Sequence, residues 1–323
     1  MEFRVLGRSD LRVSRIAIGT RAFAERVDEA EAIRIADAGL DLGINFFDTA
    51  NVYGTGRAES LLGRMLRGRR HRVVLATRVG GVMGNGADES GLSRVAIRKA
   101  VEESLRRLQT EYIDLYFLDR PDPGQRIEET LAALEELVRE GKIRYPAVAG
   151  HASWQVAQML WHCENHAYTP PSASQCVYNL LARRAEDEHL AFCAEFGIGF
   201  VACSPLAGGL LSGKHGRNEP AGADGVLTPD WARGGQVRQP EITLGLRRLE
   251  AACKRSAVTL ASLACRWVLA QPSVDSLILG VSSLPQLTEN LKAVAGPPPD
   301  EDLRRECDAV WETLRGVAPL YHL

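Results

Sequence analysis

The sequence predicts a (β/α)8 barrel, an α/β fold in which eight parallel strands close on themselves inside a ring of helices. Short runs rich in apolar and β-branched residues alternate with longer segments of helical periodicity, which is typical of βαβ units. There are eight such runs, and the chain of 323 residues, 45% of them hydrophobic, is long enough to bury the core of one barrel. We therefore expect residues 1–323 to form a single barrel domain.

The eight expected strands are short and largely apolar. They cover residues 14–19, 44–48, 73–78, 112–118, 143–149, 173–178, 198–203 and 276–280. Amphipathic segments with charged outer faces lie between them, for example 28–42, 93–108, 126–140, 153–166, 184–196 and 284–294. Right-handed crossovers place such helices outside a closed sheet. The alternative is an open doubly wound sheet, which usually has fewer strands and a Gly-rich phosphate turn that this sequence lacks.

The segments outside this alternation are a hairpin, a long loop and a last helix. The opening FRVLGRSDLRV predicts an N-terminal hairpin that turns at residues 7–10 and caps the barrel floor. Residues 214–239 are rich in Gly, Pro, Arg and Asp and predict a long loop. The breaker segment 296–302 precedes an additional C-terminal helix, expected at 302–315 on the outside of the barrel.

Charge and composition favour a small-molecule partner. The net charge is −2, from 39 basic and 41 acidic residues, so we expect neither nucleic-acid nor membrane binding. The start of the chain lacks the apolar core of a signal peptide, and no run of about 18 apolar residues occurs, so we expect a soluble cytoplasmic protein. The seven scattered cysteines lack metal-like spacing and predict reduced thiols without a disulfide framework or a metal site. Oligomeric state is left open, because no heptad pattern occurs.

Polar residues gather where the expected strands end. The residues at these positions are Asp48, Arg78, Asp119, Gln175 and Ser204, and Tyr53 follows Asp48 on the next loop. In a barrel, such positions point into the mouth where ligands bind. Any one of them could be a cap or a layer-filling side chain. Two carboxylates, a guanidinium and a phenol are costly to bury together unless they pair, so the set predicts a functional site.

Five stretches of the chain resemble the aldo-keto reductase superfamily. They are GINFFDTANVYGTGRAESLLG, SLRRLQTEYIDLYFLDRPDP, SQCVYNLLARRAE, SPLAGGLLSGK and LGVSSLPQLTENLKA. The pattern is most similar to the longer-loop branch, which includes potassium-channel β subunits and deoxysugar-pathway reductases. The resemblance implies a barrel with NADPH across its mouth and hydride transfer to a carbonyl. It also implies that Tyr53 donates the proton, with Asp48, Arg78 and Asp119 completing the catalytic set.

The resemblance further implies a set of residues that bind NADP(H). One group lies ahead of a helix whose N-terminal amides favour the anionic adenosine end, and another forms the loop that covers the pyrophosphate. The cofactor-binding residues implied in this way are Gly19, Thr20, Gln175, Cys203, Ser204, Pro205, Leu206, Ala207, Gly208, Lys214, Gly280, Ser282, Ser283, Gln286, Glu289 and Asn290.

The catalytic motifs depart from the family pattern at two charged positions. Arg78 stands where the family has a lysine, and Asp119 stands where it has a histidine. Arginine stays protonated and forks onto carboxylates, so it can still pair with Asp48, although its bulk and geometry are not those of lysine. Within the family, an acid at the position of Asp119 is associated with reduction of a double bond conjugated to a carbonyl.

The residues expected around the nicotinamide ring also depart from the pattern. Ala149 and Gly150 replace the serine and asparagine that hold the carboxamide, and Cys203 replaces the aromatic residue that stacks on the ring. Because hydride transfer demands close geometry, these losses should lower rate more than binding. His151 at the barrel mouth is a candidate for substrate contact or proton transfer, and Cys203 is a candidate nucleophile if Arg78 lowers its pKa.

The leading hypothesis is a reductase that uses NADPH on a carbonyl or conjugated enone of a small molecule. One alternative is a non-redox enzyme on the same barrel, such as a dehydratase, epimerase or cyclase, in which a bound dinucleotide is structural. A second alternative is a regulatory protein that binds the dinucleotide without turnover. Substrate identity and the preference between NADP and NAD are left open by the sequence.

Overall fold

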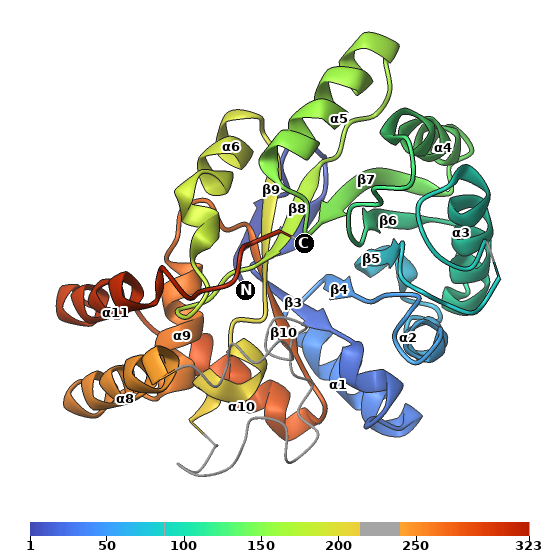
Figure 1. The fold of residues 1–323 in the computed structure, drawn as a ribbon. Helices are drawn as coiled ribbons and strands as arrows, with labels where there is room; N and C mark the ends of the chain where they lie inside the picture. Colours follow the sequence, from blue (N-terminus) through green and yellow to red (C-terminus); the bar gives the residue numbers. More distant parts are fainter. Residues whose placement is uncertain (87, 214–239, 323) are drawn as a thin grey trace.

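Eight parallel strands close into a barrel in the computed structural model of the chain (Figure 1). The structure describes residues 1–86, 88–213 and 240–322, so the expected loop 214–239 lies outside the described residues. The barrel strands are β3 (Ile16–Gly19), β4 (Phe46–Asp48), β5 (Val74–Val79), β6 (Ile113–Leu118), β7 (Ile143–Ala149), β8 (Ala173–Val177), β9 (Gly199–Cys203) and β10 (Ser276–Gly280). Their bounds agree within two residues with the sequence expectation, and the predicted (β/α)8 fold is confirmed.

The barrel strands are apolar because both of their faces are buried. Every residue of β5 and of β6 is buried, since one face of each strand fills the barrel interior and the other packs under the helices. The strands pair in sequence order, and β10 closes the circle by pairing with both β3 and β9. This register aligns Gly19, Asp48 and Ala76 on three neighbouring strands, which brings the carboxyl ends of the strands to one rim.

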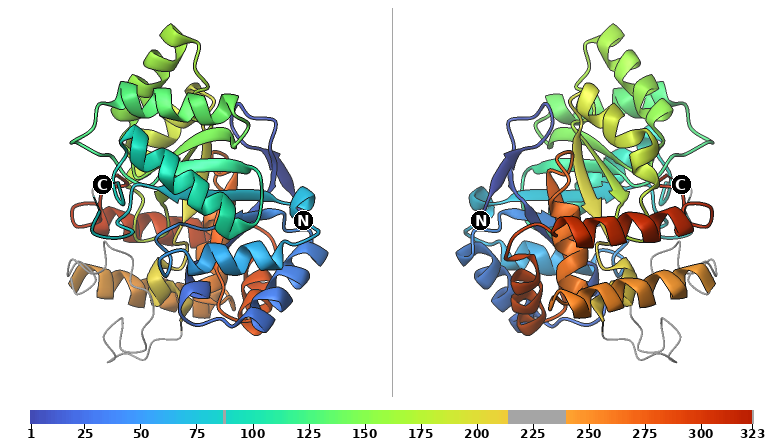
Figure 2. Two further views of the ribbon diagram at one scale, coloured as in Figure 1. Left: turned by 90° about the vertical axis from the view of Figure 1, so that its right-hand side faces the viewer. Right: turned by 90° about the vertical axis from the view of Figure 1, so that its left-hand side faces the viewer.

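The N-terminal hairpin closes the other end of the barrel. Strands β1 (Phe3–Val5) and β2 (Arg12–Ser14) pair antiparallel, and Leu6 and Leu11 join the interior cluster of the barrel. At Gly7 the backbone has a φ of +52°, and a Cβ there would lie 2.3 Å from the Ser172 carbonyl oxygen, so only glycine fits. Figure 2 shows this hairpin and the C-terminal segment at opposite ends of the barrel.

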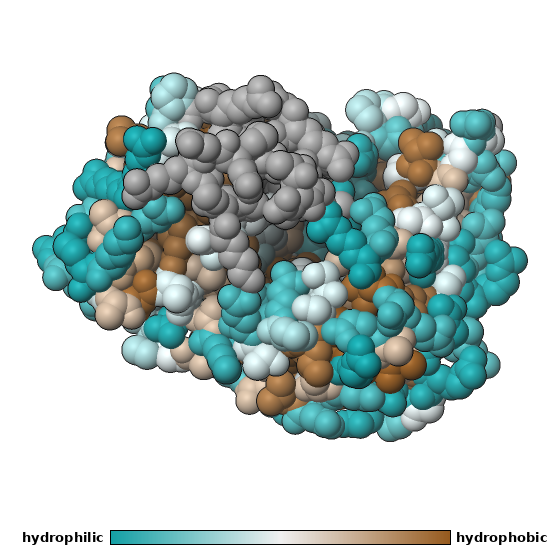
Figure 3. Space-filling model, turned by 90° about the horizontal axis from the view of Figure 1, so that it is seen from below, coloured by the Kyte–Doolittle hydropathy of each residue, from teal (hydrophilic) through white to brown (hydrophobic). Residues whose placement is uncertain are grey.

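Helices surround the barrel with their charged faces outward. They are α1 (Glu29–Asp41), α2 (Arg57–Met65), α3 (Arg94–Leu108), α4 (Ile127–Arg139), α5 (Ser153–His166), α6 (His189–Glu195), α8 (Pro240–Arg255), α9 (Leu260–Leu269), α10 (Leu284–Val294) and α11 (Glu301–Leu314). The side shown in Figure 3 is mainly hydrophilic with hydrophobic residues interspersed. Within the described ranges, no helix combines the length and apolar character that a bilayer span requires.

One expected helix is interrupted in the structure, and the last helix forms as expected. The expected helix 184–196 is divided into a 3-10 turn, η3 (Arg184–Asp187), and α6, because Glu188 adopts φ −162° and interrupts the helical geometry. The last helix, α11, forms close to the expected bounds, is capped by Asp300 and packs against α8. All seven cysteines lie in described segments and are free thiols, and six of them are buried.

Candidate active site

Polar side chains from three other strands of the rim meet around Arg78. Asp48 is the last residue of β4, Arg78 lies near the end of β5, Asp119 follows β6 and Gln175 lies on β8. Since the strands are parallel, their carboxyl ends meet at one rim, and four of the side chains that sequence analysis grouped come together there, whereas Ser204 lines the adjoining cavity.

The guanidinium of Arg78 is the centre of a buried hydrogen-bond network. Its Nη2 donates to Asp48 Oδ1 at 2.5 Å, and its Nη1 donates to Gln175 Oε1 at 2.7 Å and to Asp119 Oδ1 at 3.3 Å. The Nε atom donates to the carbonyl oxygen of Thr49 at 3.2 Å. The planar fork of arginine allows these contacts at once, which the single ammonium of lysine could not reproduce.

The network keeps charges together in a site with little solvent. Burial raises the pKa of Asp48, while the adjacent Arg78 and the amide of Gln175 oppose this rise by stabilising the carboxylate. Burial alone would lower the pKa of Arg78, but Asp48, Tyr53 and Asp119 outweigh it and raise that pKa above its ordinary value. Arg78 is therefore permanently cationic and anchors both carboxylates.

Tyr53 reaches the same site from the loop between β4 and α2. Three consecutive residues after it, at positions 54–56, have φ between +53° and +87°, which turns the chain sharply into α2. A Cβ at Gly54 would lie 2.8 Å from Ala24 Cβ, so the turn packs closely on the preceding segment. No hydrogen-bond partner of the Tyr53 hydroxyl occurs among the described residues, which leaves this group available to a ligand.

The phenol of Tyr53 is protonated at neutral pH. Burial raises the pKa of Tyr53 to about 12, and Asp48 and Asp119 act in the same direction. The guanidiniums of Arg78 and Arg21 oppose this rise. A protonated phenol beside cations is able to donate a proton to a developing negative charge.

A cavity of about 1680 Å³ connects this site to the segment after β10. We call its two ends the tyrosine end, formed by Asp48, Tyr53, Arg78 and Asp119, and the serine end, formed by Ser282, Gln286, Glu289 and Asn290. Residues that follow β9 line the cavity between the two ends. The cavity is long and continuous, which suits an extended ligand with room for a second molecule.

Most of the residues expected to bind a dinucleotide line this cavity. Those that do are Gly19, Gln175, Cys203, Ser204, Pro205, Leu206, Gly208, Gly280, Ser282, Gln286, Glu289 and Asn290. Three others do not line it, because Thr20 donates to the Asp48 carbonyl oxygen, Ala207 is buried and Ser283 caps α10. Lys214 lies outside the described residues.

The serine end is organised by local hydrogen bonds. The side-chain oxygen of Gln286 accepts from the backbone N–H of Ser282 at 2.7 Å and from its hydroxyl at 2.8 Å. Ser283 caps α10, while the N–H of Leu284 donates to a carboxylate oxygen of Glu31 at 2.5 Å. These contacts fix the first turn of α10 against the cavity, although the N-terminal amides of Leu284 and Gln286 are already engaged.

The segment after β9 follows an unusual backbone path. Ser204 and Ala207 have φ of +57° and +49°, in the left-handed region that residues with a Cβ rarely adopt. The side-chain amide of Asn179 donates to the carbonyl oxygen of Ser204 at 2.9 Å and holds this path in place. Such conformations occur often at ligand sites, where the surrounding structure maintains them.

The part of the cavity lining at the ends of β7 and β9 offers little side-chain polarity. Ala149 and Gly150 line the cavity without any polar side-chain atom. Cys203 also lines it, and burial raises the pKa of its thiol to about 12 even though Arg78 acts in the opposite direction. The idea that Arg78 activates Cys203 as a nucleophile is therefore wrong, because burial outweighs the cation and the thiol stays protonated.

The structure also corrects the interpretation of His151. Its side chain is only 1% exposed, its Nδ1 lies 2.9 Å from the carbonyl oxygen of Ala149, and it does not line the cavity. Burial lowers the pKa of His151 to about 4, so the ring is neutral at pH 7 rather than poised near neutrality. It supports the backbone behind the rim.

Several cavity residues were missed by sequence analysis, and Arg21 and the C-terminal residues are two examples. Arg21 follows Gly19 and Thr20 directly, and its position just after a strand end was the available signal. The C-terminal residues 320–322 also line the cavity, and no local pattern predicts this. The ring of Tyr321 stacks on His189 at 4.5 Å, and its hydroxyl oxygen accepts from the N–H of Ser153 at 3.1 Å.

A (β/α)8 barrel with an ionic site at the carboxyl ends of its strands and a long adjoining cavity belongs to the class of small-molecule binding barrels. The model of the aldo/keto reductase family matches residues 15–312. The chain belongs to this family, as its motifs indicated.

Several characterised and uncharacterised relatives share most of their length with this chain. It is 38% identical over 305 residues to YrpG, an uncharacterised oxidoreductase of Bacillus subtilis (strain 168), covering 91% of each chain. It is 32% identical over 339 residues to the human aflatoxin B1 aldehyde reductase member 2, covering 99% of this chain and 93% of the relative. A probable voltage-gated potassium channel subunit beta of rice (Oryza sativa subsp. japonica) is 34% identical over 305 residues, with 91% of each chain covered.

Proposed function

We propose that the protein is an NADP(H)-dependent reductase that acts on a carbonyl, or on a double bond conjugated to a carbonyl, of a small molecule. One observation carries the proposal: a protonated phenol, without a hydrogen-bond partner among the described residues, and an arginine–carboxylate network occupy one end of a cavity whose other end has the family's adenosine-binding pattern. The names of two relatives support a reductase, because one is called an oxidoreductase and the other an aldehyde reductase.

The serine end is the part of the cavity that fits the adenosine portion of the cofactor. Ser282 and Gln286 present fixed polar atoms, and Asn290 is held by a hydrogen bond to the Gly280 carbonyl oxygen at 3.4 Å. The cations Arg266 and Lys292 line the same end, which favours a phosphate-bearing dinucleotide. These features support NADP(H) as the cofactor.

The tyrosine end is where proton transfer would occur. A bound NADPH supplies hydride. Tyr53 then donates its phenolic proton to the substrate oxygen, where the developing alkoxide or enolate carries negative charge. The cation of Arg78 lies close enough to stabilise the phenolate that remains, and Asp48 holds Arg78 in place.

We assign Asp119 to positioning of the substrate or to donation of a proton as a second general acid. Its side chain is 18% exposed to the cavity while one of its oxygens accepts from Arg78. The second oxygen has only a long contact of 3.9 Å with Arg120, so it can also face a ligand. Since Ala149 and Gly150 cannot hold a carboxamide, we expect the reacting ring to be positioned less firmly and turnover to be slow.

The test is to combine the purified protein with NADPH and a panel of aldehydes, ketones and enones, and to follow consumption of the reduced dinucleotide. We expect Tyr53→Phe to lower kcat by about 10² to 10⁴-fold, the usual contribution of a general acid. Tyr145→Phe is the matched control, because that phenol lies at the barrel floor and donates to Asp10 at 3.1 Å. An unchanged rate in Tyr53→Phe, or the absence of any substrate-dependent NADPH consumption, would overturn the proposal.

A further inference from the structure

Arg21 is fixed at the rim beside the tyrosine end. It begins the 3-10 turn η1 (Arg21–Ala24) directly after β3 and Thr20. Phe23 of the same turn is fully buried, and its N–H donates to the Thr20 carbonyl oxygen at 2.9 Å. The backbone that carries Arg21 is therefore anchored in the barrel core, and its side chain lines the cavity.

Among the described residues, the guanidinium of Arg21 has no carboxylate partner. Its Cζ lies 5.9 Å from the centre of the Tyr53 ring, and across the described segments no carboxylate oxygen comes within ion-pair distance of it. A cation over an aromatic face is held only weakly in this way. The fork of donors on Arg21 remains available to a ligand in the cavity.

Within residues 1–86, 88–213 and 240–322, the positive charges at the tyrosine end outnumber the negative ones. Asp48 and Asp119 are both engaged by Arg78, and Arg120 adds a long contact of 3.9 Å to the second oxygen of Asp119. Two carboxylates thus face three guanidiniums, Arg21 included, and one positive charge is left over. Glu25 and Arg26 also line the cavity but have opposite charges, so they do not change this excess.

We infer that the substrate carries an anionic group, a carboxylate or a phosphate, which Arg21 binds within a few bonds of the reducible carbonyl. The inference rests on the proposed function, because Tyr53 defines where the carbonyl lies. The distance from Arg21 to the Tyr53 ring limits the spacer to a short chain or a single ring. Arginine suits this role because its fork matches both kinds of anion.

The kinetic test compares aldehydes of equal shape and different charge. The probes are 4-carboxybenzaldehyde, 4-formylphenyl phosphate and the neutral 4-methylbenzaldehyde, each with saturating NADPH. We expect at least one anionic probe to have a kcat/KM roughly tenfold or more above the neutral one, as a charge-assisted hydrogen bond allows. The two anionic probes show whether the site prefers a carboxylate or a phosphate.

Substitutions then assign the preference to one side chain. Arg21→Met should abolish the preference for the anion, Arg21→Lys should restore part of it, and Arg12→Met should leave it unchanged. Arg12 is the matched control because it is an exposed cation at the opposite end of the barrel. Equal kcat/KM for all three probes in the wild type would overturn the inference.

A binding measurement separates this inference from the proposed function. Calorimetry with 4-(hydroxymethyl)benzoate in the presence of NADP⁺ needs no turnover, and we expect about tenfold weaker binding in Arg21→Met than in the wild type. If no aldehyde is reduced but this difference appears, the anion site stands and the reductase proposal fails. If Arg21→Met instead weakens binding of NADP⁺ itself and not of the benzoate, Arg21 serves the dinucleotide and the inference is wrong.

Discussion

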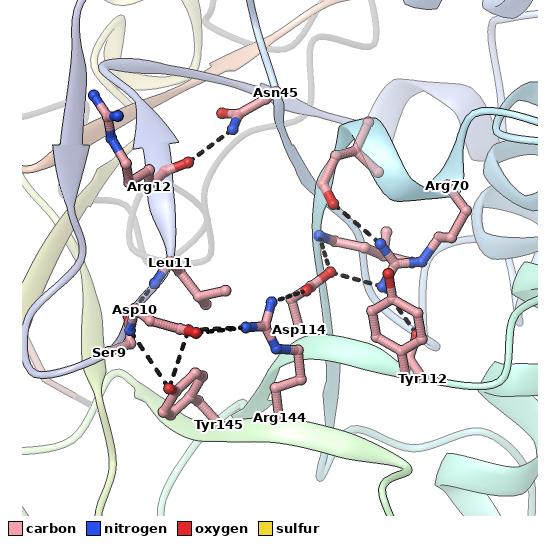
Figure 4. Close-up of polar contacts among 12 residues, drawn as sticks. Ser9, Asp10, Leu11, Arg12, Asn45, Arg70, Tyr112, Asp114, Arg144 and Tyr145 are labelled. Carbon is pink, nitrogen blue, oxygen red and sulfur yellow. Dashed lines mark hydrogen bonds and ion pairs between the residues drawn. The ribbon is translucent and has the colours of Figure 1, made fainter.

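The two ends of the barrel hold similar arginine–aspartate networks with different surroundings. At the floor, Asp114 accepts from Arg70 at 2.6 Å and from the N–H of Leu75 at 2.9 Å, and its other oxygen accepts from Arg144 at 3.0 Å (Figure 4). Arg144 continues to Asp10 of the hairpin turn at 2.8 Å. At the rim, Arg78 plays the corresponding part between Asp48 and Asp119.

The difference between the two networks lies in what covers them. The hairpin closes the floor, so the acceptors of Asp114 are filled by the chain itself. The rim opens onto the cavity, where the Tyr53 hydroxyl has no partner in the described part of the chain and Arg21 has no carboxylate. A buried ion pair in a barrel thus indicates a ligand-binding site only when polar groups without a partner and an open cavity lie next to it.

The largest effect is expected for Arg78→Ala at the rim. Asp48 would lose its cation in a buried position, which should lower the free energy of unfolding by roughly 3 to 5 kcal/mol. Urea unfolding would measure this loss, and turnover should disappear with it. Arg78→Lys keeps the charge but not the fork of donors, so it should recover only part of the stability. A fully stable Arg78→Ala would contradict the assigned role of this network.

A smaller effect on stability, with no effect on chemistry, is expected for Asp114→Asn at the floor. Its partners Arg70 and Arg144 have side chains that are 16% and 40% exposed, so water can partly replace the lost carboxylate. We expect a loss of about 2 kcal/mol in urea unfolding, below the range for fully buried pairs. The kcat of the folded variant should equal that of the wild type. A specific loss of kcat would mean that the two ends are coupled.

Acid pH should lower the free energy of unfolding through His151, which lies behind the rim. Burial lowers its pKa from 6.5 to about 4 in the folded chain, so between these values the unfolded chain binds the proton more readily. The free energy of unfolding should therefore fall as pH falls from 6.5 to about 4, by roughly 2 kcal/mol for this group after allowance for local relaxation. Unfolding at several pH values in the wild type and in His151→Gln would measure it. An identical pH dependence in the two proteins would contradict the buried neutral ring.

The smallest effect is expected for Cys203→Phe at the cavity wall. A ring at this position could stack on a bound nicotinamide, which should tighten NADPH binding by about 0.5 to 1.5 kcal/mol. Cys203→Ser is the control without a ring and should give no gain. Calorimetric titration with NADPH compares the three proteins. Weaker binding in Cys203→Phe would show that the position does not face the ring.

Much of the fold could be predicted because barrel strands are buried on both faces and appear as apolar runs. The helices α2, α8 and α9 were not among the examples named from the sequence, since α2 is short and α8 and α9 follow each other without a strand between them. The break at Glu188 depends on backbone geometry that periodicity does not report.

The sequence predicted those site residues that lie at the ends of strands. It missed the features that depend on tertiary contacts between distant segments. Asp48, Arg78 and Gln175 meet because parallel strands share a rim. The neutrality of His151 and the raised pKa of Cys203 follow from burial by distant segments, which no local pattern shows. The position of Tyr321 at the cavity likewise depends on its contacts with His189 and Ser153.

The most direct measurement is the transfer of deuterium from NADPH labelled at the reactive carbon of its nicotinamide to a reduced product. The proposed function predicts deuterium on the former carbonyl carbon or on the saturated carbon of an enone, with transfer greatly slowed in Tyr53→Phe and unaffected in Tyr145→Phe. A product formed without deuterium, or formed equally well in the absence of any dinucleotide, would contradict it and favour proton-transfer chemistry on the same barrel.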